Sequence, residues 1–189
     1  MEENGMKINF CSSCGAPMEA KIPVDDDHIR SVCTQCPHVH YENPKMVVGC
    51  IPVFENRILL CRRNIEPRKG KWTLPAGYLE NKESVQDGAV RETLEETRAT
   101  VAIVAPYRLF NIVNMDQIYL MFYARMGDDS FGSTSESSEV KLFKEADIPW
   151  DELAFEVIRQ TLIDFFCDRK NRVYPFEIKD LKPDRKRVL

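Results

Sequence analysis

Short apolar runs, rich in β-branched residues and separated by turn residues, occupy the middle of the chain. Residues 46–54 form the first run, Glu55 and Asn56 provide a turn, and residues 57–62 form the second run. Two such runs joined by two polar residues are typical of a β-hairpin. Further runs of the same kind predict strands at residues 101–104, 107–113, 117–125 and 139–144.

Two other segments have the apolar spacing of amphipathic helices, residues 84–97 and residues 151–168. In the first helix we expect Val90, Leu94 and Thr97 to face the core. One helix follows the third strand and the other lies near the end of this β-rich order. The pattern therefore predicts an α+β domain with a mixed sheet between helices.

The first of these helices carries three carboxylates on one face. Glu92, Glu95 and Glu96 are spaced i, i+3 and i+4, so their side chains point in the same direction. Like charges at this spacing repel one another and mildly destabilise a helix. A divalent cation such as Mg²⁺ or Mn²⁺ prefers oxygen ligands and would offset that repulsion. The spacing therefore predicts a site for a hard divalent cation.

Composition limits the other classes of function. The chain has 189 residues, of which 43% are hydrophobic and 30% charged, enough for one ordinary domain with a small addition. A net charge of −4 and a pI of about 5.5 argue against nucleic-acid binding as the main role. No apolar run approaches the ~20 residues of a membrane span. The first residues do not resemble a signal peptide, so we expect a cytoplasmic protein.

Four of the seven cysteines form two pairs, each with two residues between its members: Cys11 and Cys14, and Cys33 and Cys36. The 18 residues between the pairs fit the spacing of a Cys₄ zinc site. Four thiolates complete a closed tetrahedral site, so we expect the zinc to support folding rather than catalysis. A redox pair, free thiols, or a ligand exchange with His38 or His40 are the alternatives. Residues 1–44 are thus expected to form a zinc ribbon.

The segment around the acidic helix resembles the Nudix box, Gly-x5-Glu-x7-Arg-Glu-apolar-x-Glu-Glu-x-Gly-apolar. Six positions match in register: Gly77, Glu83, Arg91, Glu92, Glu95 and Glu96. The lead-in Trp72-Thr-Leu-Pro-Ala-Gly-Tyr-Leu-Glu80 is also similar to that of the family. The last glycine of the box is Arg98 here, and Thr93 and Ala99 replace apolar residues. Either Arg98 is strained in a left-handed conformation or the helix ends differently, so we expect a change of geometry there.

The resemblance implies a fold and site residues. It implies an α/β/α sandwich over residues 45–168, followed by a charged tail at 169–189, and the ribbon is similar to that of NADH pyrophosphatase-like Nudix proteins. The expected metal ligands are Glu92, Glu95 and Glu96, with the carbonyl of Gly77 or alternatively of Ala76. Glu83 and Arg91 are expected to form a structural pair that ties the loop to the helix.

The general base is less defined by the sequence. Related pyrophosphatases use a glutamate before a late strand, a place that Glu136 and Glu139 occupy here. We expect Glu139 because it directly precedes the apolar run, with Glu92 as the alternative. The basic loop at residues 62–71 could contact phosphates or remain a solvated loop. Trp72 and Phe110 could stack on a base or pack in the core.

The expected reaction is metal-dependent cleavage of a nucleoside diphosphate linked to another group, releasing AMP. ADP-ribose or a substrate of the FAD or NADH type is favoured, although the Ser-Gln-Pro-Trp-Pro-Phe-Pro motif of NADH pyrophosphatases does not occur after the box. The resemblance also allows a homodimer. The alternatives are a zinc-ribbon regulator that binds nucleic acid and senses a metabolite through its Nudix domain, and a purely structural interaction module.

Overall fold

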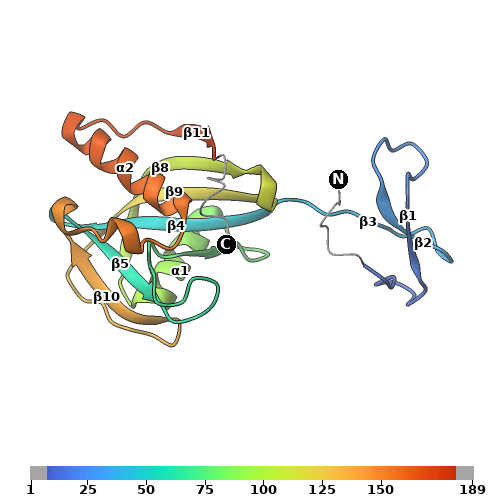
Figure 1. The fold of residues 1–189 in the computed structure, drawn as a ribbon, viewed down its shortest axis with the longest axis horizontal. Coiled ribbons are helices and arrows are strands. Elements are labelled where there is room, and N and C mark those ends of the chain that lie inside the picture. The colour runs from blue at the N-terminus through green and yellow to red at the C-terminus, as the bar shows by residue number, and fades with distance from the viewer. Residues whose placement is uncertain (1–7, 182–189) are drawn as a thin grey trace. The chain divides into compact units, whose positions relative to one another are not determined.

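The computed structural model describes residues 8–181, and the chain divides into two compact units, Met1–Asn43 and Pro44–Leu189 (Figure 1). The first unit contains a three-stranded antiparallel sheet. Its strands are β1 (Met18–Lys21), β2 (Arg30–Cys33) and β3 (Val39–His40), in the order β1-β2-β3. A small cluster of Cys11, Ala16 and Cys33 forms its buried centre. Such a core is too small to be stable alone, which is the usual reason for a structural metal.

The second unit is built on a mixed sheet of eight strands, in which the principal order is β10-β5-β4-β9-β8-β11, with β6 beside β5 and β7 beside β4. The strands are β4 (Lys45–Phe54), β5 (Arg57–Arg63), β6 (Trp72–Thr73), β7 (Ala76–Tyr78), β8 (Val101–Ile112), β9 (Gln117–Met126), β10 (Ser137–Phe143) and β11 (Glu177–Asp180). Strands β4 and β9 are parallel, as are β8 and β11, and the other pairs are antiparallel. The predicted mixed sheet is therefore confirmed.

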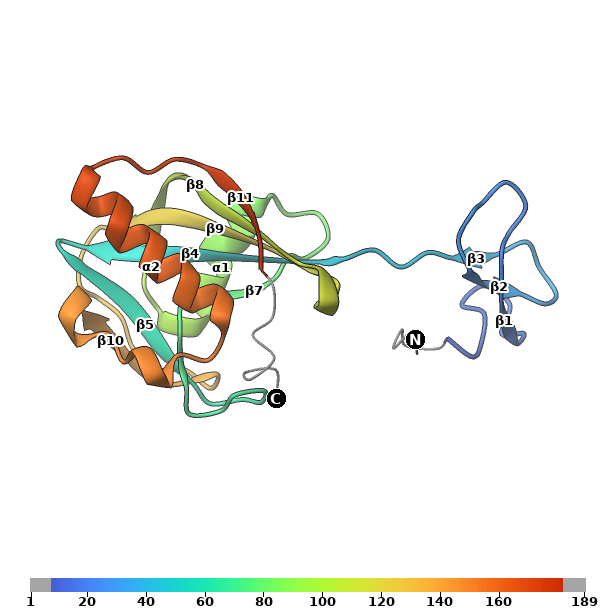
Figure 2. The same cartoon turned by 45° about the horizontal axis from the view of Figure 1, so that its top comes forward.

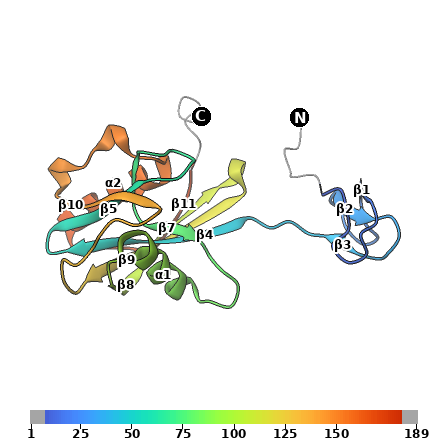
Figure 3. The same ribbon diagram turned by 90° about the horizontal axis from the view of Figure 1, so that it is seen from below.

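Two helices cover opposite faces of this sheet, α1 (Val85–Thr97) and α2 (Glu156–Asn171) (Figures 2 and 3). Side chains alternate between the two faces along β4. Val48 and Cys50 pack in the cluster that includes Ala89 of α1. Ile51 and Val53 instead join the larger cluster that includes residues of α2. The period of two along a strand thus produces the α/β/α sandwich.

The apolar face of α1 differs from the prediction. Thr97 is buried as expected, but Leu94 is 48% exposed. The buried residues of α1 include Ala89, Thr93 and Thr97, and a Cβ atom on Gly88 would lie 3.0 Å from Val48. At about 100° per residue, Leu94 lies on the other side of the helix from Ala89 and is therefore exposed.

Segments near the chain's middle and end also depart from the prediction. The two strands expected at 101–104 and 107–113 form one strand, β8, with register shifts on both sides of Pro106. Proline donates no ladder hydrogen bond and commonly lies at a bulge. Three 3₁₀ turns, at Val113–Met115, Glu145–Asp147 and Trp150–Glu152, also occur, and α2 begins at Glu156 rather than 151.

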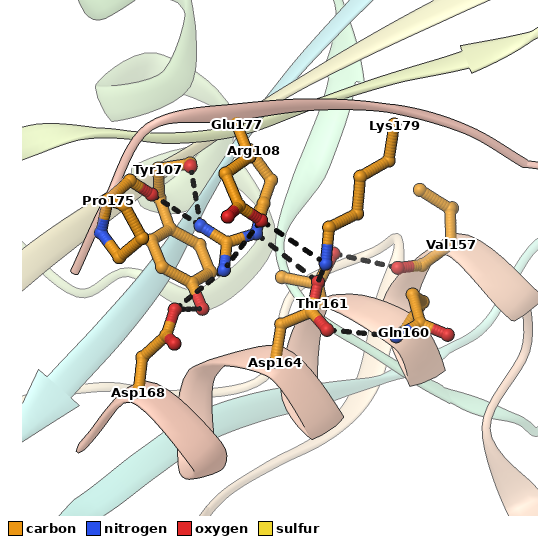
Figure 4. Close-up of polar contacts among 10 residues, drawn as sticks. All are labelled: Tyr107, Arg108, Val157, Gln160, Thr161, Asp164, Asp168, Pro175, Glu177 and Lys179. Atoms are coloured by element: carbon orange, nitrogen blue, oxygen red, sulfur yellow. Dashed lines mark hydrogen bonds and ion pairs between the residues drawn. The ribbon is translucent and has the colours of Figure 1, made fainter. Parts of the chain in front are cut away.

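The segment expected as a charged tail contains β11, which pairs in parallel with β8. Arg108 of β8 explains how charged residues join the sheet (Figure 4). Its side chain is 2% exposed and lies 3.2 Å from Asp164, 2.6 Å from Asp168 and 3.5 Å from Glu177. The acidic residues of α2 and β11 thus neutralise a buried guanidinium, and residues 182–189 of the expected tail lie outside the described part of the chain.

Candidate active site

Helix α1 has defined ends that fix the carboxylates it carries. At its start, the Ser84 hydroxyl accepts a hydrogen bond from the backbone N–H of Asp87 at 3.1 Å. At its end, Arg98 has φ 58° and ψ 4°, and its N–H donates to Leu94 O at 2.8 Å. Arg98 therefore adopts the left-handed conformation that suits glycine, and the expected change of geometry is not found. The cost of this conformation for a residue with a Cβ is about 1–2 kcal/mol.

Arg91 connects the loop before α1 to the helix. Its Nε and Nη2 donate to the two carboxylate oxygens of Glu83 at 3.0 and 2.7 Å, and Nη1 donates to Glu92 at 2.7 Å and Glu95 at 2.9 Å. The hydrogen bonds from Arg91 lower the pKa of Glu83 to about 2. The structure thus brings Glu83 and Arg91 together and extends that pair to two of the three helix carboxylates.

Glu96 has a different environment from its neighbours on the helix. Its side chain is buried, and Oε2 accepts from the N–H of Ala76 at 3.1 Å and from the Cys61 thiol at 3.7 Å. Burial raises the pKa of Glu96 to about 7, and burial also raises the pKa of Glu92. Within residues 8–181, no cationic side chain forms an ion pair with Glu96. A buried carboxylate without a cation is costly, and a metal ion would remove that cost.

A cavity of about 950 Å³ opens beside these carboxylates. Its acidic wall includes Glu92, Glu95, Glu96 and Gly77, together with Glu80 and Arg91. Its basic wall comes from Arg63 at the end of β5 and from Arg68 and Lys71 in the loop that follows. Its apolar part includes Ile112, Met115, Tyr119, Trp150 and Phe155. Carboxylates, cations and aromatic rings in one cavity suit a ligand that is part anion and part flat apolar group.

Of the two glutamates before the late strand, Glu136 and Glu139, only the first lines the cavity. Glu136 lines it, and its charge contributes to the raised pKa values of Glu92 and Glu96. Glu139 does not line the cavity, and its carboxylate lies 3.6 Å from Nη1 of Arg62. Strand β10 explains the separation, because Glu139 pairs with Arg62 within the ladder and Glu136 lies just before the strand.

Residues outside the box also form the cavity. Arg63 donates from Nε to Pro67 O at 2.8 Å, and its guanidinium lies 5.2 Å from the centre of the Phe155 ring. The basic run at residues 62–71 signalled Arg63, whereas nothing in the sequence distinguished Phe155 or Tyr119. Trp72 and Phe110 pack in the core, which is one of the two roles expected for them.

The four paired cysteines converge in the first unit. Their sulfur atoms all lie within 4.8 Å of one another, with Cys11 and Cys36 at 3.7 Å and Cys14 and Cys33 at 3.5 Å. Tetrahedral zinc with Zn–S bonds of about 2.3 Å places sulfur atoms about 3.8 Å apart, which fits this spacing. The backbone N–H of Gln35 donates to Cys33 and lowers the pKa of that thiol to about 6, which favours the thiolate that binds metal.

Comparison with known proteins identifies the family. Residues 43–164 match the family model for the NUDIX domain, and residues 9–42 match the model described as Nudix N-terminal, a zinc ribbon. The chain belongs to the Nudix hydrolases. The NUDIX match covers the sandwich and the carboxylate helix of this Nudix hydrolase, and the second match covers the four cysteines. Within residues 8–181, no helix is long and apolar enough to cross a membrane.

Individual relatives agree with this assignment. A crystal structure of a NUDIX hydrolase from Nitrosomonas europaea has a TM-score of 0.90 and 43% identity, covering 93% of this chain and 100% of that chain. A NAD-capped RNA hydrolase NudC from Edwardsiella ictaluri is 35% identical over 49% of this chain and 34% of its own length. An ADP-ribose pyrophosphatase from Methanocaldococcus jannaschii is 28% identical over 61% of this chain and 70% of its own. The Nudix hydrolase described here thus matches about a third of the length of the Edwardsiella protein.

Proposed function

We propose that this Nudix hydrolase cleaves the diphosphate of a nucleoside diphosphate joined to another group and releases AMP. ADP-ribose and dinucleotides of the FAD or NADH type are the proposed substrates. The observation that carries the proposal is the single cavity in which the helix carboxylates face a basic loop and an apolar compartment. A volume of about 950 Å³ is at the upper end of common ligand pockets, which suits a dinucleotide-sized molecule.

The residues of the acidic wall fit a divalent cation such as Mg²⁺ or Mn²⁺. Glu96 is buried without a cationic partner among the described residues, and Glu92 and Glu95 share the single guanidinium of Arg91. We assign Glu92, Glu95 and Glu96, with the carbonyl of Gly77, as the groups that hold the metal. A bound cation would offset the charge of the diphosphate and lower the pKa of water.

The other walls supply groups for the substrate. Arg63 and Lys71 place positive charge on the cavity wall, where they would bind phosphate oxygens. Glu136 lines the cavity near the helix carboxylates, and we assign it as the general base that takes a proton from the attacking water. The apolar compartment would take the base or the second nucleoside and exclude water from it.

The proposed substrates are supported by two relatives, which are a NAD-capped RNA hydrolase and an ADP-ribose pyrophosphatase. The chain lacks the Ser-Gln-Pro-Trp-Pro-Phe-Pro motif after the box, so ADP-ribose and FAD are proposed ahead of NADH.

The test is turnover of a substrate panel with Mg²⁺ or Mn²⁺: ADP-ribose, FAD, NADH, coenzyme A, diadenosine polyphosphates and 8-oxo-dGTP. AMP release from ADP-ribose or FAD, abolished in Glu96→Gln, is the expected result. Turnover of the nucleoside triphosphate alone would overturn the proposed substrate class. Turnover that is unaffected by Glu96→Gln would overturn the proposed metal site.

A further inference from the structure

Tyr119 lines the cavity together with the helix carboxylates and the basic residues. It is on β9, in register with Val47 of the parallel strand β4 and with Phe110 of the antiparallel strand β8. Its ring packs against the core that α2 covers, and the residue lines the cavity. Arg63 and Glu96 line the same cavity, and the charges of both act on the Tyr119 hydroxyl.

The Tyr119 hydroxyl differs from those of Tyr78, Tyr107 and Tyr123 in its hydrogen bonding. Tyr107 donates to Asp168 at 2.7 Å, Tyr123 accepts from Arg125 at 3.3 Å, and Tyr78 accepts from Gln117 at 3.1 Å. Among residues 8–181, the structure gives the Tyr119 hydroxyl no partner. No side-chain oxygen or nitrogen in that part of the chain is both fully enclosed and unpaired, so this hydroxyl is open to the cavity.

Burial also raises the pKa of Tyr119 to about 12. The hydroxyl therefore stays protonated at neutral pH and acts as a hydrogen-bond donor that carries no charge. A neutral donor can lie beside Glu96 without competing with a cation for its carboxylate. It can also bind an anionic oxygen, and hydrogen bonds to charged groups are stronger than those between neutral groups.

We infer that the Tyr119 hydroxyl binds the substrate by donating a hydrogen bond to a non-bridging oxygen of its diphosphate. This inference rests on the proposed function. The diphosphate is the part of the substrate that belongs between Glu96 and Arg63, because one would hold the metal and the other would bind a phosphate.

The test is Tyr119→Phe, which removes the hydroxyl and keeps the ring in the core. We expect kcat/KM for the preferred diphosphate substrate to fall by about 10- to 100-fold. We expect the Kd for α,β-methylene-ADP, whose diphosphate bridge cannot be hydrolysed, to rise by a similar factor in calorimetry with Mg²⁺. The Tm should be unchanged, because this hydroxyl has no partner in the described protein.

Tyr107→Phe is the matched control, since its hydroxyl donates to Asp168 and neither residue lines the cavity. That variant should lower the Tm and leave kcat/KM and the Kd within about twofold, as a structural hydrogen bond predicts. If Tyr119→Phe instead lowers the Tm and leaves the Kd unchanged, the inference is overturned.

The measurements distinguish a wrong role for Tyr119 from a wrong reaction for the protein. If the wild-type protein hydrolyses the diphosphates but Tyr119→Phe retains its kcat/KM and its Kd, the role of Tyr119 is wrong and the proposed function stands. If the wild-type protein hydrolyses none of them, the proposed reaction is wrong. A higher Kd of Tyr119→Phe than of the wild type for α,β-methylene-ADP would still support Tyr119 as a residue that binds diphosphate.

Discussion

The backbone of Gly77 lies directly against the carboxylate of Glu92. A Cβ atom added to Gly77 would be 2.3 Å from both Cδ and Oε2 of Glu92. No side chain fits in that space unless the carboxylate moves. The glycine that precedes the helix in sequence thus sets the position of one of its proposed metal ligands.

Gly77→Ala should therefore impair activity more than stability. The flexible Glu92 side chain can move aside, so the free energy of unfolding should change by no more than about 1 kcal/mol. A displacement of a ligand by about 1 Å costs on the order of 10²-fold in rate, and kcat/KM should fall accordingly. Gly127→Ala is the control, because a Cβ there meets nothing within 4 Å. Full activity in Gly77→Ala would contradict the placement of Glu92.

Glu136 and Glu139 provide a matched pair for the general base. Glu136→Gln should lower kcat by ~10²-fold or more, because the water loses its proton acceptor. Glu139→Gln should stay within about threefold of wild type, because its carboxylate faces Arg62 outside the cavity. Steady-state kinetics with the best substrate of the panel distinguishes the two residues. A large loss of kcat in Glu139→Gln but not in Glu136→Gln would show that Glu139 is the base, as the sequence predicted.

Glu83 gives the protein a predictable response to acid. The Arg91 guanidinium lowers the pKa of Glu83 from 4.5 to about 2 in the folded chain. Because the unfolded chain binds that proton at a higher pH, the stabilisation is fully present above about pH 4.5 and is lost as the pH falls towards 2. The Tm difference between wild type and Glu83→Gln, measured without divalent cation, should therefore narrow from about pH 5 to pH 3. A difference that does not vary with pH would exclude this ionisation as its source.

The cysteine cluster predicts one zinc per chain and a ribbon that depends on it. Chelation should release the metal and expose the amides of residues 8–43 to hydrogen exchange, since a core of three buried residues cannot hold them. The unit from Pro44 has its own larger core and should retain its protection. Metal analysis with and without Cys33→Ala, followed by exchange mass spectrometry, checks both parts. Protection of the ribbon after zinc loss would show that the metal is dispensable.

The buried ion pairs of Arg108 should contribute strongly to the stability of the protein. Arg108→Ala leaves Asp168 without its cation, while Asp164 keeps its ion pair with Lys179, and should destabilise the protein by about 3–5 kcal/mol. The exposed Arg125 is a control, and Arg125→Ala should change stability by no more than about 0.5 kcal/mol. Denaturant unfolding measures both variants. Equal effects would mean that the buried network adds no stability.

The sequence predicted the elements that follow from local chemistry. The box spacing placed Glu83, Arg91 and the three glutamates on one loop and helix, and the cysteine spacing placed four sulfur atoms together. The apolar period gave most strands and both helices. These signals are local, since each depends on residues within one or two turns or one short hairpin.

The features that the sequence did not predict depend on contacts between distant segments. Leu94 is exposed because the sheet buries the helix face of Ala89 and Thr93 instead. Glu139 lies outside the cavity because it is paired with Arg62 in the ladder between β10 and β5. Strand β11 has too few apolar residues to be predicted, and its place depends on Arg108. Periodicity contains no information about which distant partner a residue will meet.

The position of Arg108 in the chain has a consequence for synthesis. Its acidic neighbours Asp164 and Asp168 follow it by 56 and 60 residues, and Glu177 is made later still. In a nascent chain that has produced only β4 to β9, Arg108 lacks the later residues that surround it, so its guanidinium stays hydrated. The ribbon has all four cysteines after Cys36 and can assemble as soon as it leaves the ribosome. The sheet of the catalytic unit gains β11 beside β8 only after Asp180 has been made.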